Sequence, residues 1–350
     1  MRALLSAIVL MLGCLAQPVC GQDELRIWAI DTEGGKATLV VGPTGQGMLI
    51  DAGFPGFQDR DLNRIVQVVS QAGLKRLDYL VVTHYDIDHV GNVPAVANKI
   101  PVDTFVDHGA PAVTDRMAKQ FYEAYLKVTE GAKRIVVKPG DHIPMAGLEI
   151  TVVSSGGKLI EKPVDGNGLP NPLCSTASRK TWSGVDEDQS ENACSIGLLF
   201  KFGNFKMLDL ADLTWNKELD LVCPVNLLGA VDVFMVSHHG HEISNSPALI
   251  HAIRPAVAIM NNGSRKFGYP ACFEALRSCP SRPQVYQLHW SERAGQLNSP
   301  EELIANLRSG PDGNWLCIIA RPDGTFKVKN SRTGQAHPFP GSRREGDAAK

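Results

Sequence analysis

The sequence carries almost no excess of charge. Its 350 residues include 35 basic and 37 acidic side chains, so the formal net charge is −2. This balance argues against a protein that holds polyanions by bulk electrostatics alone, although it leaves room for a local basic groove. No stable complex with nucleic acid is therefore expected. Hydrophobic residues make up 43% of the chain, which is enough for a sizeable core and excludes wholesale disorder.

Several common motifs are also missing. No Cys-x-x-Cys spacing occurs, so a zinc site built from thiolates is not expected. No Gly-x-Ser-x-Gly turn occurs, so a serine nucleophile of the α/β-hydrolase kind is not expected either. Beyond the N-terminus, no apolar run is long enough to cross a bilayer, and no transmembrane segment is expected in the mature chain.

The N-terminus has the pattern of an export signal. Arg2 is followed by an apolar run over residues 4–16 and then by small residues up to Gly21. This pattern predicts a cleaved signal peptide over residues 1–21. A membrane anchor is the alternative, but the run is short for a bilayer span. The mature chain is therefore expected to be exported, either to the periplasm or as a secreted protein.

The cysteines that follow the predicted signal peptide fit an exported protein. Six of them remain after residue 21, and disulfides between them are plausible in an oxidising compartment. The sequence does not fix their pairing, because six cysteines allow 15 complete pairings. The pairs to test first are Cys272 with Cys279 and Cys174 with Cys194.

Residues 22–330 are expected to form one domain of class α/β. Short apolar runs bounded by turn residues alternate with stretches of helical spacing, which indicates two stacked mixed sheets with helices outside. Residues 156–190 break this pattern and are expected to be a loop insertion, and residues 331–350 a flexible tail. Strands are predicted at 25–30, 37–41, 48–50, 79–83, 104–106, 135–137, 148–153, 195–202, 205–210, 231–237, 257–260, 285–288, 315–320 and 325–328, and helices at 61–74, 93–98, 115–129, 215–221, 246–253 and 271–277.

Potential metal ligands concentrate after one buried strand. The stretch His84-Tyr-Asp86-Ile-Asp88-His89 holds four of them within six residues. His84 and Asp86 stand two apart at a strand end and can point to one side, whereas a turn could aim the other two at a second point nearby. Imidazole and carboxylate together suit Zn²⁺, Mn²⁺ or Fe²⁺. The alternative is a polar loop that only caps a helix.

Three more predicted strands end in residues of the same kind. Asp51 follows strand 48–50, Asp212 follows strand 205–210, and His238-His239-Gly240 follows strand 231–237. Loops at the carboxyl ends of strands commonly gather into a functional site. Singly, Asp51 or Asp212 would more simply be a cap or a turn residue, but together these strand ends indicate a metal site.

The motif set resembles the metallo-β-lactamase superfamily, whose hallmark is His-x-His-x-Asp-His after a strand. Here Asp86 replaces the second His, a variant similar to the extracytoplasmic domain of ComEC-type competence proteins. The segments 49–53, 192–195, 211–212 and 238–240 also match that domain in order, whereas its Gly-x-Gly-Asp stretch is replaced at 32–37. The resemblance covers roughly residues 25–290 and implies an αββα sandwich of two mixed β-sheets flanked by helices.

The resemblance also implies a role for each ligand-type residue. His84 and Asp86 would bind one metal, and Asp88 and His89 a second. Asp212 would bridge the two metals, and His239, or else His238, would complete the second site. Asp51 would orient the ligand loop, and Asn192 stands where a further histidine is usual. The implied cofactors are two divalent ions, Zn²⁺ or Mn²⁺. The implied ligands are His84, Asp86, Asp88, His89, Asp212, His239 and His238.

An exported metal-dependent hydrolase is the expected function. A metal-bridged hydroxide would attack the substrate, and Asp88 would orient the hydroxide or carry its proton. A phosphodiester is the expected substrate, and hydrolysis of a carboxylic ester, a lactone or a β-lactam on the same site is the alternative. A second alternative is a non-catalytic binding protein on a decayed fold. The Arg265-Lys266 pair could reach an anionic substrate, and three histidines are candidates for substrate contact: His108, His241 and His289.

Overall fold

Most strands of the chain lie in two large mixed sheets. The computed structural model describes residues 23–112, 115–164, 168–177, 188–311 and 313–341, and the predicted signal peptide lies outside them. A third, small antiparallel pair joins β9 (Leu169–Pro170) to β12 (Val225–Asn226). Among the described residues, no helix is both long enough and apolar enough to cross a membrane.

The first sheet has nine strands in the order β19-β18-β17-β1-β2-β3-β4-β5-β6. Pairing is antiparallel from β19 to β3 and parallel from β3 to β6. The strands are β1 (Leu25–Ala29), β2 (Thr38–Val41), β3 (Gly47–Ile50), β4 (Leu77–Val81), β5 (Val102–Asp107), β6 (Lys133–Val136), β17 (Leu316–Ala320), β18 (Phe326–Asn330) and β19 (Ala336–Phe339).

The second sheet has eight strands in the order β16-β15-β14-β13-β11-β10-β7-β8. Pairing is parallel from β16 to β11 and antiparallel from β11 to β8. The strands are β7 (Glu149–Ser155), β8 (Lys158–Leu159), β10 (Gly197–Phe202), β11 (Phe205–Asp209), β13 (Val233–Met235), β14 (Val257–Met260), β15 (Gln284–His289) and β16 (Ile304–Asn306).

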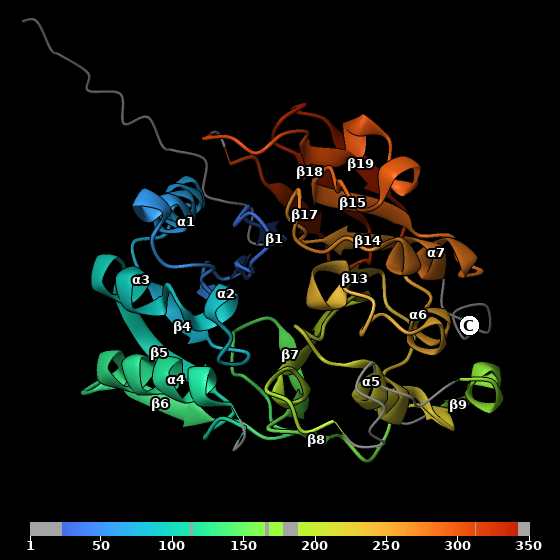
Figure 1. The fold of residues 1–350 in the computed structure, drawn as a ribbon, viewed down its shortest axis with the longest axis horizontal. Helices are drawn as coiled ribbons and strands as arrows, with labels where there is room; N and C mark the ends of the chain where they lie inside the picture. The colour runs from blue at the N-terminus through green and yellow to red at the C-terminus, as the bar shows by residue number, and fades with distance from the viewer. Residues whose placement is uncertain (1–22, 113–114, 165–167, 178–187, 312, 342–350) are drawn as a thin grey trace, which may run out of the picture.

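Side chains alternate between two faces along each strand and so build three apolar layers. In β4, Tyr79 and Val81 pack in the core between the sheets, whereas Leu80 packs under helices. In β11, Met207 joins the central core and Leu208 the opposite helical layer. Figure 1 shows the two sets of helices on opposite sides, so the predicted αββα fold class is confirmed. The helices are α1 (Arg60–Gln71), α3 (Val93–Lys99) and α4 (Arg116–Thr129) on the first sheet, and α5 (Trp215–Val222), α6 (Pro247–Ile253) and α7 (Pro270–Ser278) on the second.

The chain after residue 330 departs from the flexible tail that the sequence predicted. Residues 336–339 form β19, which pairs antiparallel with β18 and extends the first sheet. The ring of Phe339 stacks on Phe326 at 4.8 Å, and His337 Nδ1 lies 3.0 Å from the hydroxyl of Tyr286. Alternate residues of this segment therefore face the protein. The alternation was not recognised in the sequence because the segment is polar overall. Residues 342–350 lie outside the described part of the chain.

The disulfide also differs from the two pairs that the sequence put first. Cys174 is bonded to Cys223, and the other described cysteines, including Cys194, are free. Cys272 lies near the start of α7 and Cys279 directly follows it. Seven residues of helix span about 10 Å, which is too far for a disulfide. The observed bond ties the insertion, which also contains β8 and β9, to the end of α5.

Candidate metal centre

The candidate site is built from the ends of four strands, two from each sheet. β3 and β4 are parallel neighbours in the first sheet, and β11 and β13 are parallel neighbours in the second. Asp51 follows β3, and the motif 84–89 leads from β4 into the short helix α2 (Ile87–Val90). Asp212 follows β11, and His238 and His239 form a tight turn after β13. Parallel strands end at the same edge of a sheet, which is why these distant segments meet.

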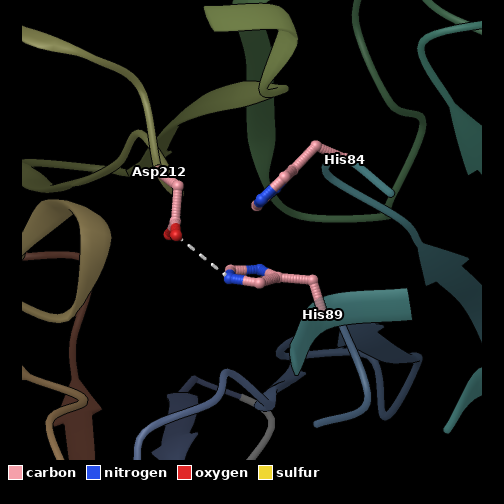
Figure 2. Close-up of side chains that lie close together, drawn as sticks. All are labelled: His84, His89 and Asp212. Carbon is pink, nitrogen blue, oxygen red and sulfur yellow. Dashed lines mark ion pairs between the residues drawn. The ribbon is translucent and has the colours of Figure 1, made fainter. Parts of the chain in front are cut away.

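His84, His89 and Asp212 form a first group of side chains that could hold a metal ion. Their ligand atoms lie within 4.8 Å of one another, and Figure 2 shows both imidazoles and the carboxylate turned toward one another. His89 Nε2 lies 3.2 Å from Asp212 Oδ2. His84 Nε2 is buried without a hydrogen-bond partner, and Asp86 Oδ2 lies 3.7 Å from it. An unpartnered buried nitrogen is costly, so its position fits a bound cation.

Asp88, His89 and His239 form a second such group, again with ligand atoms within 4.8 Å of one another. Asp88 Oδ2 lies 3.3 Å from His239 Nε2 and 3.8 Å from His89 Nε2. Asp212 Oδ2 lies 3.4 Å from His239 Nε2. The two groups are therefore adjacent, with His89 common to both and Asp212 in reach of both. Each group could hold one cation, and the two positions would then be neighbours.

His238 lies beside the same central carboxylate. Its Nε2 atom is 3.5 Å from Asp212 Oδ2. Burial lowers the pKa of the His238 imidazole to about 3, so the ring is neutral at physiological pH. Of the two adjacent histidines, His239 is the one grouped with Asp88 and His89. The geometry thus favours His239 over His238 as the candidate ligand beside Asp88. His238 contacts Asp212 but belongs to neither group.

Hydrogen bonds on the far side of the imidazole rings fix their orientation. His89 Nδ1 donates to Asp51 Oδ2 at 2.8 Å, and the same buried carboxylate accepts from the amide and the hydroxyl of Thr83 at 2.9 and 2.7 Å. His239 Nδ1 donates to the backbone carbonyl of Asn261 at 3.1 Å. Each ring thereby turns its Nε2 atom toward the site, the usual arrangement behind metal-binding histidines.

The backbone around these ligands is strained. Asp51, Ala211, His238 and His239 all have positive φ, at 59°, 49°, 50° and 52°. Such conformations cost non-glycine residues on the order of 1–3 kcal/mol each and cluster at functional sites, where the surrounding structure holds them. Here the strain lies at three of the four strand ends. It turns each chain sharply enough to aim side chains of both sheets at one point.

The charges of the site depend closely on one another. Burial alone would raise the pKa of Asp212, but His89, His239 and His238 outweigh it and hold that pKa well below its ordinary value. Burial alone would lower the pKa of His89, but Asp212, Asp51 and Asp88 raise it well above its ordinary value. A buried cluster of this kind needs positive charge near its carboxylates, which a bound cation would supply.

The predicted substrate contact His108 and the predicted site residue Asn192 lie beside Glu191, a residue that the sequence did not single out. The buried His108 ring donates through Nε2 to Glu191 Oε1 at 2.9 Å, and Glu191 also accepts from the backbone amides of Tyr85 and Ala112. Glu191 thus fixes the backbone of the ligand loop at Tyr85, and the buried His108 fixes the carboxylate of Glu191. The Asn192 side-chain oxygen is buried and unpartnered, so it retains a lone pair for a ligand.

The predicted substrate contact His289 lies in a separate buried cluster. Its Nε2 atom is 2.7 Å from Asp31 Oδ1, and Arg64 pairs with the other oxygen of Asp31 at 2.9 Å. The group Asp31, Glu33 and His289 has the spacing of metal ligands, but Arg64 already forms an ion pair with both carboxylates. His289 is fully buried and pairs with Asp31, so it is not accessible to a substrate, and the predicted substrate contact at this residue is wrong.

The remaining candidate, His241, directly follows the turn that carries His238 and His239. Its half-buried ring is 4.7 Å from that of His238 and 4.8 Å from those of Phe267 and Tyr269. Its Nδ1 accepts from the amide of Ile243 at 3.2 Å. His241 is therefore the predicted substrate contact that the structure leaves partly accessible.

Two lysine ion pairs near the site, one buried and one partly exposed, were not predicted. Lys36 forms an ion pair with Asp209, just before the turn that carries Asp212, and Lys266 forms one with Asp88. The sequence contained a signal for Lys36, because it stands at the place of the missing Gly-x-Gly-Asp motif. For Lys266 the signal was the basic pair that follows β14.

Comparison with known proteins supports part of the resemblance. Residues 30–167 match the family model of the metallo-β-lactamase superfamily, a stretch that includes Asp51 and the motif 84–89. The match supports the superfamily resemblance. It ends before Asp212 and His239, so their roles rest on the geometry described above.

The chain is also similar to a curated protein and to several solved structures. A coenzyme F420H(2) oxidase of Methanothermobacter marburgensis is 29% identical over 121 residues, which are 34% of this chain and 28% of that protein. The chain therefore spans less than a third of the length of this relative. A protein provisionally named a metal-dependent hydrolase, from Parabacteroides distasonis, has a TM-score of 0.43 at 13% identity over 76% of this chain and 93% of its own. A diphosphatase of the PhnP family has a TM-score of 0.39 at 13% identity over 75% of this chain and 94% of its own.

Proposed function

We propose that this chain is an exported, two-metal hydrolase of phosphodiesters, of the ComEC-type variant of the superfamily. The observation that carries the proposal is the position of His89 and Asp212 between two adjacent groups of potential ligands. Ions a few ångströms apart are the arrangement that enzymes use to bind both the attacking and the leaving oxygen of a phosphoryl centre.

The residues present fit two divalent ions. His84, with its unpartnered Nε2, would hold one ion together with Asp86, and Asp88 and His239 would hold the other. His89 and Asp212 lie between these pairs. Bound divalent ions supply Lewis acidity, which activates water and stabilises negative charge on an ester oxygen. Three carboxylates stand beside three imidazoles, and Asp86 and Asn192 replace two histidines that are usual in the superfamily. This set favours Mn²⁺ over a strict zinc preference.

Asp88 has a second part in the proposal. Burial would raise the pKa of Asp88, but His89, His239 and Lys266 lower it far below its ordinary value. The Asp88 carboxylate is therefore ionised at any working pH and can orient a water molecule by accepting its proton in a hydrogen bond. The neighbouring Lys266 ammonium offers a donor to an anionic group beside that water.

Other substrates on the same site are the alternative. A carboxylic ester, a lactone or a β-lactam could react at the same centre, although Asp86 and Asn192 differ from the histidines usual in β-lactam hydrolases. A binding protein on a decayed fold is the second alternative. The nearly complete ligand set, held in strained turns, argues against decay.

Metal analysis and a substrate screen test the proposal. The protein purified with Mn²⁺ or Zn²⁺ should contain about two ions per chain, and His84→Ala should lose about one of them. His142→Ala is the matched control, because His142 is exposed in the part of the chain that the structure describes. Turnover of bis-p-nitrophenyl phosphate, with p-nitrophenyl acetate and nitrocefin slower, would support phosphodiester hydrolysis. Two bound ions without turnover of any ester would contradict the hydrolase.

Export has its own test. Expression of the full chain in a bacterial host with fractionation should place the protein outside the cytoplasm. Mass spectrometry of that material should show loss of residues 1–21. Full-length protein retained in the cytoplasm would contradict the export part of the proposal and leave the chemistry untouched.

A further inference from the structure

Lys266 occupies a built position at the edge of the candidate metal centre. Its ammonium contacts Asp88, and it lies 4.6 Å from the ring centroid of Phe54 and 4.8 Å from that of Phe267. Aromatic faces attract a cation and here restrict it from two sides. The side chain remains 31% exposed. A lysine ammonium has three N–H donors, and the contact with Asp88 uses one of them.

The loop that carries Lys266 is fixed to the ligand turn by its backbone. The amide of Gly268 donates to the carbonyl of His239 at 3.0 Å, and the amide of Tyr269 donates to that of Gly240 at 2.9 Å. The Phe267 ring stacks on His239 with centroids 5.3 Å apart. The position of the ammonium relative to His239 is therefore set by the fold rather than by a flexible side chain alone.

Gly34 packs directly against this lysine from the other sheet. A Cβ atom at residue 34 would lie 2.9 Å from Lys266 Cβ and 3.0 Å from the amide nitrogen of Gly263, and Gly34 has a φ of +96°. Any larger residue would have to move the lysine loop. Close approach of the 31–37 segment thus holds Lys266 beside Asp88, which is a local reason for glycine at residue 34.

An aromatic surface continues outward from the lysine. Phe54 meets Phe57 edge to face at 6.1 Å, and Phe57 is 64% exposed. The guanidinium of Arg60 lies 4.6 Å from the Phe57 ring. Exposed apolar rings beside fixed cations suit a ligand that is flat and apolar at one end and anionic at the other.

We infer that Lys266 binds the anionic group of the substrate and that Phe54 and Phe57 contact a flat ring attached to it. The substrate class is then an anionic ester with an aromatic substituent, such as an aryl or nucleoside phosphodiester. This inference rests on the proposed hydrolase function and narrows its substrate. Asp88 holds the ammonium beside the reacting group, and one of the remaining N–H donors binds a non-bridging ester oxygen.

The first experiment compares an anionic and a neutral ester that share one leaving group. The readout is the ratio of kcat/KM for bis-p-nitrophenyl phosphate to kcat/KM for p-nitrophenyl acetate. Lys266→Met should lower this ratio about 10- to 100-fold, the loss expected for one charge-assisted hydrogen bond, and Lys266→Arg should restore part of it. Arg277→Met is the matched control, because Arg277 is an exposed cation on α7 and belongs to neither candidate ligand group. Its ratio should stay within about twofold of wild type.

A binding measurement separates specificity from loss of the centre. Calorimetry with phenylphosphonate should show weaker binding to Lys266→Met by a similar factor, while the metal content stays at the wild-type value. Gly34→Ala, which displaces the lysine loop, should weaken this binding in the same direction. Equal loss on both esters with an unchanged ratio, or unchanged phenylphosphonate affinity, would overturn the inference. Since wild-type turnover would persist in that case, the outcome differs from failure of the hydrolase proposal.

The ring contact has its own comparison. Phe57→Ser should raise KM for bis-p-nitrophenyl phosphate several-fold more than KM for methyl p-nitrophenyl phosphate, which lacks the second ring. A contact between a flat ring and an aromatic side chain is lost in this variant only for the substrate with two rings. An equal change for the two substrates would exclude Phe57 from the ring contact.

Discussion

The Nδ1 atom of His89 lies 2.8 Å from the carboxylate of Asp51, which is completely buried and also accepts two hydrogen bonds from Thr83. This contact joins the end of β3 to the ligand loop after β4. It sets which nitrogen of His89 faces the site. The orientation of the one imidazole common to both candidate ligand groups therefore depends on a residue that would not itself touch a metal.

Loss of this contact should weaken metal binding. Asp51→Asn keeps the size of the side chain but removes the charge that favours a proton on His89 Nδ1, and such partners typically contribute 10- to 100-fold in metal affinity. Competition with a chelator should show a loss of about that size. Thr83→Val removes the hydroxyl donor to Asp51 and should give a smaller loss. Wild-type affinity in Asp51→Asn would contradict an orienting role.

The ion pair between Lys36 and Asp209 should contribute mainly to stability. Both side chains are almost completely buried, and Asp209 also accepts from the amide of Ala211 at 3.0 Å, in the strained turn before Asp212. Lys36→Met leaves a buried carboxylate without its cation and should lower the free energy of unfolding by about 3–5 kcal/mol. Urea denaturation measures this change. The double variant Lys36→Met with Asp209→Asn should recover much of the loss, and failure to do so would contradict a pairing role.

Much of the fold could be predicted because its signals are local. Alternation in β4 and helical spacing in α1 reflect which faces are buried, and both are visible within a few residues. The site could be predicted from residue types at strand ends, since ligand-type side chains after apolar strands are rarely there by chance. His84, His89 and Asp212 do converge, as expected from that pattern.

The rest depended on contacts between distant segments. Asp88 and Lys266 are 178 residues apart, and the sequence around each of them gives no sign that the two side chains are in contact. The partner of Cys174 is Cys223 rather than Cys194, because the insertion folds back onto α5, a path that its irregular composition conceals. β19 was missed because an edge strand needs only one apolar face. These features depend on how the strands and loops are connected in space, which cannot be inferred from the local periodicity of one sequence.

Glu218 should make stability depend on pH in the acid range. Burial raises its pKa to about 7, although the amides of Asn245 and Ser246 each donate to its carboxylate at 2.7 Å. The folded state therefore binds this proton more tightly than the unfolded state, whose pKa is 4.5. Below pH 4.5 both states are protonated, and as pH rises toward 7 the folded state loses up to about 3 kcal/mol of stability from this group.

Removing the Glu218 carboxyl group should remove that dependence. Glu218→Gln cannot ionise, so the difference in unfolding free energy between variant and wild type should shift in favour of the variant as pH rises from about 4.5 to 7. Urea unfolding at a series of pH values measures the difference. Absolute stability can fall at every pH, since the amide cannot accept from both backbone donors. A pH-independent difference would contradict the raised pKa.

The disulfide between Cys174 and Cys223 should contribute strongly to stability. It closes a loop with a sequence separation of 49 residues, and chain-entropy arguments give about 4 kcal/mol for a loop of that size. Cys174→Ser with Cys223→Ser should lower the free energy of unfolding by roughly that amount, as should a reducing agent on the wild type. Cys194→Ser is the control: because Cys194 is free, this variant keeps the disulfide and should lose as much stability on reduction as the wild type does. Equal stability of the reduced and oxidised protein would show that the insertion is held by its packing against α5 and α6 instead.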